Sequence, residues 1–293
     1  MNAATTPYTL PSPASAVDVR SWYERKTRWL LDKYGPGPRV HFHTGLVAEG
    51  TVPASDALGL RAQLVAGQEA LLDRAASTWD ASRTFRGQVL DVGCGLGGSA
   101  LYFAASPDTH LTALSNVPEH LEWVARFAAQ AGLSDRVCCN CSDAHELGEA
   151  ARCDAAYSIG ASNYFDRTRW FRELARVVKP GGTVGIEDTF KVDEAAARKF
   201  DAYWLSRIGT KASYEQAAAD AGFELVSAEE VSDEASRWYE LSVAHSRALL
   251  RERSLSPDEV AARERSISWQ AEFADGYRAR AFEDWILCFR RKG

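Results

Sequence analysis

The sequence predicts an α/β protein in which a parallel sheet is wound with helices and carries a helical cap. From residue 87 onward, short apolar runs bounded by turn residues alternate with amphipathic helical segments, whereas the first 85 residues are helical in pattern. One apolar run leads into a glycine-rich turn that opens a helix, a pattern typical of sheets that bind a nucleotide-like ligand. These features favour one ligand-binding domain under a cap.

Composition excludes several classes of function. The 293 residues, 46% hydrophobic and 25% charged, suffice for a large core, and the formal net charge of -6 without a basic run disfavours nucleic-acid partners. No apolar stretch approaches the roughly 20 residues that span a bilayer, and the first residues lack the pattern of a secretory leader. We therefore expect a cytoplasmic protein with a small-molecule partner and no membrane partner, and leave a homodimer open.

The six cysteines predict neither disulfides nor a metal site. Four of them lie in or beside apolar runs, so we expect buried free thiols. Cys138, Cys139 and Cys141 offer three sulfurs within four residues, but neighbouring side chains on a strand point to opposite faces, which is poor geometry for tetrahedral zinc. No metal is expected.

Two helices are predicted ahead of the sheet. The first begins near Val17 and stops at the Gly-Pro-Gly-Pro run of residues 35–38, and the second covers residues 56–79 with apolar spacing of i, i+3 and i+4. The predicted sheet strands cover residues 88–93, 109–115, 136–143, 153–160, 181–188, 223–231 and 282–292. Helical segments are predicted over residues 120–133, 167–182, around 213–223 and over 236–254.

A segment of about 50 residues before the final strand is too long for a hairpin, and we expect it to fold over the sheet. The expected organisation is a flexible arm over residues 1–16, a helical cap over 17–85, the ligand-binding core over 86–231, a helical lid over 232–275, and the final strand of the core over 276–293.

The glycine-rich turn is the sharpest local signal. Gly93, Gly95 and Gly98 satisfy the dinucleotide spacing G-x-G-x-x-G, which is weak evidence by itself. A nicotinamide enzyme needs an acidic residue at the end of the second strand to hold the ribose, but residues 114–116 read Leu-Ser-Asn. The acidic residue, Asp91, precedes the glycines instead, so another adenosine-containing ligand is favoured.

These residues resemble the class I S-adenosylmethionine (SAM)-dependent methyltransferases. Residues 89–97, VLDVGCGLG, match the first motif of that family, and residues 114–116 are similar to its branch of cyclopropane fatty acid synthases and terpene C-methyltransferases. Residues 142–144, Ser-Asp-Ala, look like its adenine-side motif, and residues 178–182, VKPGG, like the turn before its fifth strand. The resemblance implies a Rossmann-like sheet of seven strands, the last antiparallel, with SAM as cofactor.

The chemistry of SAM fits these positions. Glycines let the backbone approach the methionine tail, Ser115 and Asn116 can bond the ribose hydroxyls, and Asp143 can accept from the adenine amine while Ala144 donates its N–H. Asp91 caps the next helix or contributes to binding. The expected cofactor-binding residues are Asp91, Gly93, Gly95, Gly97, Ser115, Asn116, Asp143 and Ala144.

Residues 34–45 are similar to the segment before the core in bacterial C-methyltransferases that act on prenyl diphosphates and indoles. His41 and His43 lie in this loop, and their expected role is either hydrogen bonding to substrate or ordinary loop structure. The aromatic content outside the core suggests a chamber that stabilises a substrate cation, or side chains that only join the cap to the sheet. The candidate substrate contacts are Trp22, Phe42, Tyr164, Trp204 and Trp238.

Methylation at carbon requires loss of a proton, so a base is expected. Alternation along a strand directs at least one carboxylate of residues 187–188 toward the site, and in the terpene branch a Glu on this side serves substrate binding or deprotonation. Tyr23 is a further candidate from the cap. The candidate catalytic residues are Tyr23, His41, His43 and Glu187.

The predicted function is methylation of a small hydrophobic metabolite, with C3 of an indole ahead of a prenyl diphosphate. The order depends on charge, because a diphosphate needs Mg²⁺ and basic residues, and Arg25, Lys26, Arg28 and Lys33 are interpreted as the solvated face of one helix. Transfer to oxygen or nitrogen of a small aromatic metabolite stays an alternative, because the core motifs do not report the acceptor atom. So does a SAM-binding protein without catalysis.

Overall fold

A computed structural model describes residues 19–147 and 152–293, which form one seven-stranded sheet with helices around it. The strand order is β3-β2-β1-β4-β5-β7-β6. The strands are β1 Gly87–Val92, β2 Thr109–Ser115, β3 Val137–Cys141, β4 Cys153–Ile159, β5 Val178–Lys191, β6 Phe223–Glu230 and β7 Phe282–Arg291. β7 runs antiparallel to both neighbours and the other pairs are parallel, which confirms the predicted Rossmann-like sheet. The arm predicted over residues 1–16 lies outside the described residues.

Residues 178–182, predicted as a turn before the fifth strand, lie within β5. Cys153 pairs with Val178 and Ala155 with Thr183, so the register shifts between these two pairs. Gly181 has φ +79 within this irregularity, a backbone conformation that other residues rarely adopt. The segment therefore interrupts the pairing instead of preceding the strand.

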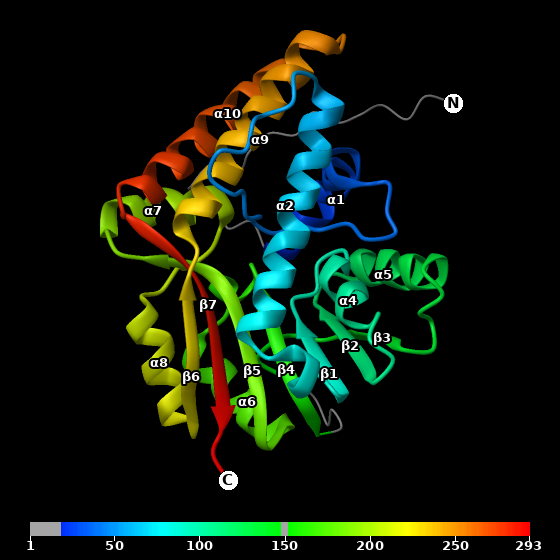
Figure 1. The fold of residues 1–293 in the computed structure, drawn as a ribbon, viewed down its shortest axis with the longest axis vertical. Helices are drawn as coiled ribbons and strands as arrows, with labels where there is room; N and C mark the ends of the chain where they lie inside the picture. The colour runs from blue at the N-terminus through cyan, green and yellow to red at the C-terminus, as the bar shows by residue number, and fades with distance from the viewer. Residues whose placement is uncertain (1–18, 148–151) are drawn as a thin grey trace.

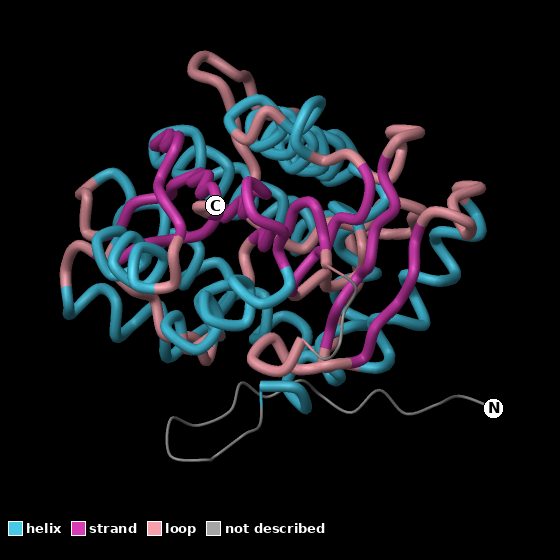
Figure 2. Tube along the Cα trace, turned by 90° about the horizontal axis from the view of Figure 1, so that it is seen from below, coloured by secondary structure: helices cyan, strands magenta, loops and turns pink. Residues whose placement is uncertain are grey.

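Helices cover both faces of the sheet, as Figure 2 shows. Those that follow the core strands are α4 Gly98–Phe103, α5 Pro118–Gln130, the 3₁₀ turn η1 Ser162–Tyr164, α6 Arg167–Val177, α7 Glu194–Trp204 and α8 Lys211–Asp220. Successive strand residues face opposite sides, so Val89 joins the larger apolar cluster beneath α2, α4 and α5, and Leu90 the smaller one beneath α6 and α8. Both faces of the central strands are thus buried.

The cap covers one end of the sheet. Its helices are α1 Val19–Tyr34, α9 Ser232–Glu252 and α10 Pro257–Arg278. α2 Ala57–Thr78 runs from the cap along one face of the sheet, and the short α3 Ala81–Thr84 follows it just before β1 (Figure 1). In Figure 1, α1, α9 and α10 lie beyond the end toward which β6 points, and β6 is parallel in direction to β5. The carboxyl ends of the parallel strands therefore face the cap. None of the described helices has the length and apolar character needed to cross a membrane.

The prediction that the cysteines are buried is wrong for half of them. All six are free, but Cys138, Cys139 and Cys141 are exposed. They lie on β3, which is the edge strand of the sheet and pairs only with β2 among the described strands. An apolar run at a sheet edge is not covered as a central strand is, and composition alone does not reveal strand order.

Trp79, at the carboxyl end of α2, joins the cap to the sheet. Its indole N–H donates to the backbone oxygen of Leu287 on β7 at 2.9 Å, and its side chain is buried. A Cβ on Gly185 of β5 would lie 2.5 Å from the indole, so glycine makes room for the ring. The ring also lies within 6.0 Å of the centroids of Phe85, Phe103 and Tyr157.

We predict that Trp79→Ala lowers the free energy of unfolding by about 3–5 kcal/mol, because it leaves a cavity and removes the hydrogen bond to the Leu287 carbonyl. Urea denaturation followed by circular dichroism measures this loss. Trp123→Ala, at a partly exposed position on α5, is the control and should cost no more than about 1.5 kcal/mol. Equal losses in the two variants would contradict the anchoring role of Trp79.

Candidate active site

Two adjoining cavities lie at the carboxyl end of the sheet. The cofactor-side cavity, about 830 Å³, is lined by the loops after β1, β2 and β3, and the cap-side cavity, about 740 Å³, by residues of α1, α7, α9 and α10. Four residues line both cavities and form their boundary: Tyr23, Phe42, Gly160 and Tyr164.

Most predicted cofactor residues line the cofactor-side cavity. They come from three loops that parallel pairing brings to the same edge of the sheet: Gly93, Gly95, Ser115, Asn116, Asp143 and Ala144. Gly95 has φ +51, and a Cβ added there would meet no atom within 4 Å. The turn thus offers open space and bare backbone, as a closely bound ligand requires. The donor and acceptor set fits the groups of SAM.

His145, which the sequence interpretation did not include, holds Asp143 in place. The backbone N–H and the Nδ1 of His145 both contact Asp143 Oδ1, at 2.8 and 2.7 Å. Its Nε2 accepts from the backbone N–H of Asp166 at 2.7 Å, so Nδ1 carries the proton. This arrangement leaves Asp143 Oδ2 to a ligand. A histidine two residues after the predicted acceptor was the available signal.

Two predicted cofactor residues lie outside the cavity. Asp91 is buried behind the glycine turn, where its Oδ2 accepts from Ser99 and from Tyr157, each at 2.9 Å, and burial raises its pKa to about 7. Gly97 starts α4 with φ +81, and a Cβ there would lie 2.8 Å from the side chain of Val124. Asp91 fixes the turn and Gly97 lets α4 pack against α5.

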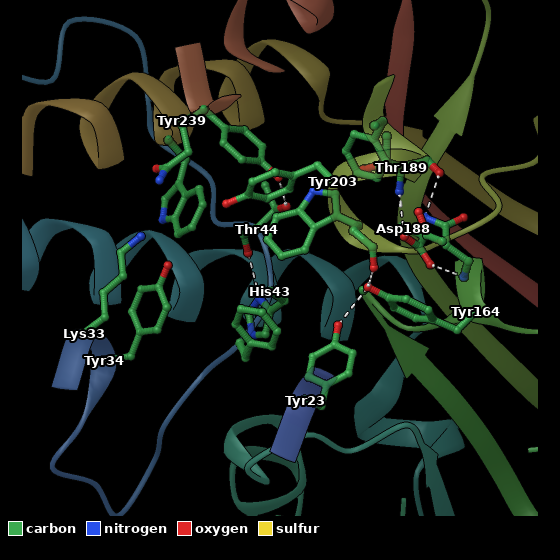
Figure 3. A pocket seen from close by; sticks show the side chains of 18 of the residues that line it. Tyr23, Lys33, Tyr34, His43, Thr44, Tyr164, Asp188, Thr189, Tyr203 and Tyr239 are labelled. Carbon is green, nitrogen blue, oxygen red and sulfur yellow. Dashed lines mark hydrogen bonds between the residues drawn. The ribbon is translucent and has the colours of Figure 1, made fainter. Parts of the chain in front are cut away.

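A chain of hydroxyl groups crosses the boundary of the cavities. Tyr23 donates to the hydroxyl oxygen of Tyr164 at 2.8 Å, and Tyr164 donates to the backbone oxygen of Trp204 at 3.0 Å (Figure 3). The ring of Tyr23 also makes an edge contact with Phe42, with centroids 5.8 Å apart. This chain links α1, η1 and α7 through one pair of tyrosines.

The two predicted loop histidines occupy different positions. His43 lines the cap-side cavity, and its Nδ1 lies 2.6 Å from the backbone oxygen of Thr44. A carbonyl only accepts, so Nδ1 carries the proton, and the buried Nε2 keeps a lone pair without a described partner. Burial, together with His41, lowers the pKa of His43 to about 3. His43 is therefore a neutral hydrogen-bond acceptor.

His41 lines neither cavity. Its Nε2 lies 2.7 Å from Oε1 of Glu69 on α2, and a Cβ on Gly98 would lie 2.4 Å from its Nδ1. The two histidines alternate along an extended segment, so only one of them faces the cavity. His41 instead packs the loop against α2 and the start of α4.

The two carboxylates predicted near the end of β5, Glu187 and Asp188, also occupy different positions. Asp188 lines the cap-side cavity, while Glu187 is buried outside its lining, beside Asp284. Burial and these neighbouring carboxylates raise the pKa of Glu187 well above its usual value. Asp188 accepts from Ser162 Oγ at 2.6 Å, from the backbone N–H of Asn163 at 3.0 Å and from its side-chain amide. Asp188 thus positions η1.

The interpretation of the α1 lysines as a solvated face is wrong. Lys26 is 4% exposed and Lys33 7%, and Lys33 lines the cap-side cavity. Lys26 Nζ lies 3.9 and 4.4 Å from the ring centroids of Trp22 and Trp204. The lysines are seven residues apart, as are Trp22 and Trp29, which places each pair on one helix face and was a signal in the sequence.

Four of the five candidate substrate contacts line the cap-side cavity: Phe42, Tyr164, Trp204 and Trp238. Trp22 does not, because it is fully buried against Tyr23 and Trp204. The lining also contains residues that the sequence interpretation did not assign to a site, among them Trp29, Tyr34, Thr44, Asn163, Phe200, Tyr203, Tyr239 and Gln270. They come from helices distant in sequence, so no local motif joins them.

Comparison with known proteins agrees with this geometry. Residues 89–182 match the family model described as methyltransferase domain. The 27-O-demethylrifamycin SV methyltransferase of Amycolatopsis mediterranei is 30% identical over 154 residues, which cover 50% of this chain and 57% of that protein. The chain spans about half the length of the curated relatives it matches.

Solved structures share the fold over nearly the whole chain. A geranyl diphosphate C-methyltransferase from Streptomyces coelicolor, in complex with Mg²⁺, geranyl diphosphate and S-adenosyl-L-homocysteine, has a TM-score of 0.75 at 16% identity, covering 96% of this chain and 100% of that one. The [4+2]-cyclase SpnF has a TM-score of 0.72 at 22% identity, covering 94% and 98%. With the family match, the sequence motifs and the strand order, these findings identify residues 89–182 as a methyltransferase domain of the class I, SAM-dependent type.

Proposed function

We propose that this chain transfers the methyl group of SAM to a small hydrophobic metabolite held in the cap-side cavity. The observation that carries the proposal is the common boundary of the two cavities, lined by Tyr23, Phe42, Gly160 and Tyr164. A methyl donor on one side and an acceptor on the other meet there without diffusion through water. Holding both reactants in one geometry is itself a large part of catalysis.

Different residues of the cofactor-side cavity would bind different parts of SAM. Gly93 and Gly95 would receive the amino-acid tail, Ser115 and Asn116 the ribose, and Asp143 and Ala144 the adenine edge. When bound, SAM supplies an electrophilic methyl group, whose bond to sulfur breaks as the acceptor bond forms, leaving a neutral thioether and a positively charged acceptor. His145 acts through Asp143 by holding its carboxylate.

For the acceptor we propose an aromatic ring that bears an N–H or O–H group, with C3 of an indole as the leading case. His43 Nε2 supports this choice, since it is a buried acceptor in the cavity with no described partner. It would bind the N–H of an indole and orient the ring. As the ring gains positive charge that proton becomes acidic, and the aromatic lining stabilises the cation meanwhile.

A prenyl diphosphate is the second candidate, and one observation favours it. Indole ranks ahead of a prenyl diphosphate only if the α1 lysines face solvent, and both lysines are buried. A cavity with an aromatic wall and a lysine would accept an apolar chain with an anionic end. A panel of indoles, phenols and prenyl diphosphates, followed by release of S-adenosylhomocysteine, separates the two candidates.

We predict that Gly95→Ala weakens SAM binding about tenfold or more, because its methyl group enters the cofactor-side cavity. Calorimetry measures the dissociation constant. Gly132→Ala is the matched control, because Gly132 has φ +69, also has no atom within 4 Å of a Cβ, and lies outside both cavities. The two variants carry similar backbone strain. Equal SAM affinity in both would refute the cofactor assignment.

His43→Ala should lower kcat/KM about 10- to 100-fold for an acceptor with an N–H or O–H group, with SAM affinity unchanged. The measurement compares indole with 1-methylindole, or the corresponding pair for whichever acceptor turns over. The methylated analogue lacks the donor and should be insensitive to the substitution. Because the pKa of His43 is about 3, its titration should leave the wild-type profile flat between about pH 5 and 8. Wild-type kinetics in His43→Ala would exclude this role.

Tyr23→Phe should lower turnover by about 10²-fold, because it removes the hydroxyl at the boundary but keeps the ring. Tyr102→Phe is the control, since the Tyr102 hydroxyl bonds to Asp73 away from both cavities. Single-turnover kinetics with saturating SAM measures the chemical step. Identical rates in the two variants would show that the Tyr23 hydroxyl takes no part.

A further inference from the structure

One end of the cap-side cavity carries the side-chain amine of Lys33. The Lys33 ammonium donates to Ser242 Oγ at 2.9 Å and lies 5.1 and 4.9 Å from the ring centroids of Trp29 and Tyr34. Within the described part of the chain, no carboxylate lies within salt-bridge distance of it. A buried lysine without a counter-ion is costly, and an anion that binds beside it recovers part of the cost.

Cationic side chains lie near Lys33, and burial together with these charges lowers the pKa values of Lys33 and of its neighbour His245. Burial, with a contribution from Arg263, lowers the pKa of Lys33 to about 7. Burial also lowers the pKa of His245 to about 3, and Lys33, Arg263 and Arg253 contribute to that shift. The acidic side chain nearest the arginines is Asp32, which lies 3.7 Å from Arg253 and 3.9 Å from Arg263. Asp32 lies outside the cavity lining and forms no salt bridge with Lys33, so it does not neutralise the charge of the protonated amine.

Lys33 is remote from the place of methyl transfer. Tyr23 and Lys33 are ten residues apart on α1, which corresponds to about 15 Å along the helix axis. Figure 3 shows Lys33 and Tyr34 on one side of the cavity and Tyr23 and Tyr164 on the other. A lysine with a lowered pKa is often a general base, but at this distance Lys33 cannot reach a proton on the reacting atom.

We propose that the substrate is an amphiphile whose anionic group, a carboxylate or a phosphate, binds Lys33 at the end of the molecule remote from the methylated atom. The Tyr34 hydroxyl lines the same cavity and can donate to the anion, while Ser242, which lies outside the lining, accepts from the Lys33 amine and holds it in position. The aromatic wall between Lys33 and Tyr23 contacts the apolar middle of the substrate. This inference rests on the proposed function, since it takes the cap-side cavity as the acceptor site.

The test is calorimetric binding of decanoate, decyl phosphate and decanol to the enzyme saturated with S-adenosylhomocysteine. Wild type should bind at least one of the two anions about tenfold more tightly than decanol, and the preferred anion separates a carboxylate from a phosphate source. Lys33→Met should abolish the preference and leave decanol affinity within about twofold, while Lys33→Arg should keep it. Equal binding of all three probes to wild type, no binding of either anion, or a preference retained in Lys33→Met would overturn the proposal.

Two further variants keep the result interpretable. Lys199→Met removes a surface lysine that pairs with Glu272, and it should preserve the anion preference. If Lys33→Met does not fold, the double variant Tyr34→Phe with Ser242→Ala should reduce the preference about threefold, and an unchanged preference overturns the proposal. Failure of the methyltransferase proposal is distinct, because it would appear as absent SAM binding or absent transfer, whatever the anion preference.

Discussion

The boundary between the two cavities depends on the hydrogen bonds of Asp188. This carboxylate, at the end of β5, accepts from Ser162, from both nitrogens of Asn163 and from the backbone N–H of Thr189 at 2.9 Å. These bonds hold η1, which ends at Tyr164. Burial raises the pKa of Asp188 to about 6, while the hydrogen bonds favour its charged form.

Tyr164 connects η1 to the cap through its hydrogen bonds. Tyr164 forms hydrogen bonds with Tyr23 of α1 and with the carbonyl of Trp204 on α7. Because Asp188 holds η1, it also fixes the contact between α1 and α7. The same arrangement exposes Gly160 to both cavities. Because the glycine turn after β1 and Asp188 of β5 lie toward the same end of the sheet, residues of one sheet line both the cofactor-side and the cap-side cavity.

The sequence pattern predicted those parts of the molecule whose structure depends on residues close together in the chain. The strands, the helices between them and the turn with Gly93 and Gly95 follow from periodicity and from backbone geometry, and most of the cofactor cavity follows from them. Lys33 and Asp188 did not, since their roles depend on α9 and on η1, which pack against them only in the folded chain. The alternation of side chains along a strand also does not predict which of residues 187 and 188 faces the cavity.

Fold alone leaves the activity open, because a geranyl diphosphate methyltransferase and a [4+2]-cyclase share it with this chain. We propose that the methyl group meets its acceptor between Tyr23 and Tyr164. Nuclear Overhauser effects from the labelled methyl of [methyl-¹³C]SAM to selectively labelled tyrosine rings test this most directly. We expect cross-peaks to Tyr23 and Tyr164, assigned by their loss in the corresponding phenylalanine variants. Binding of SAM without a contact to either ring would contradict it.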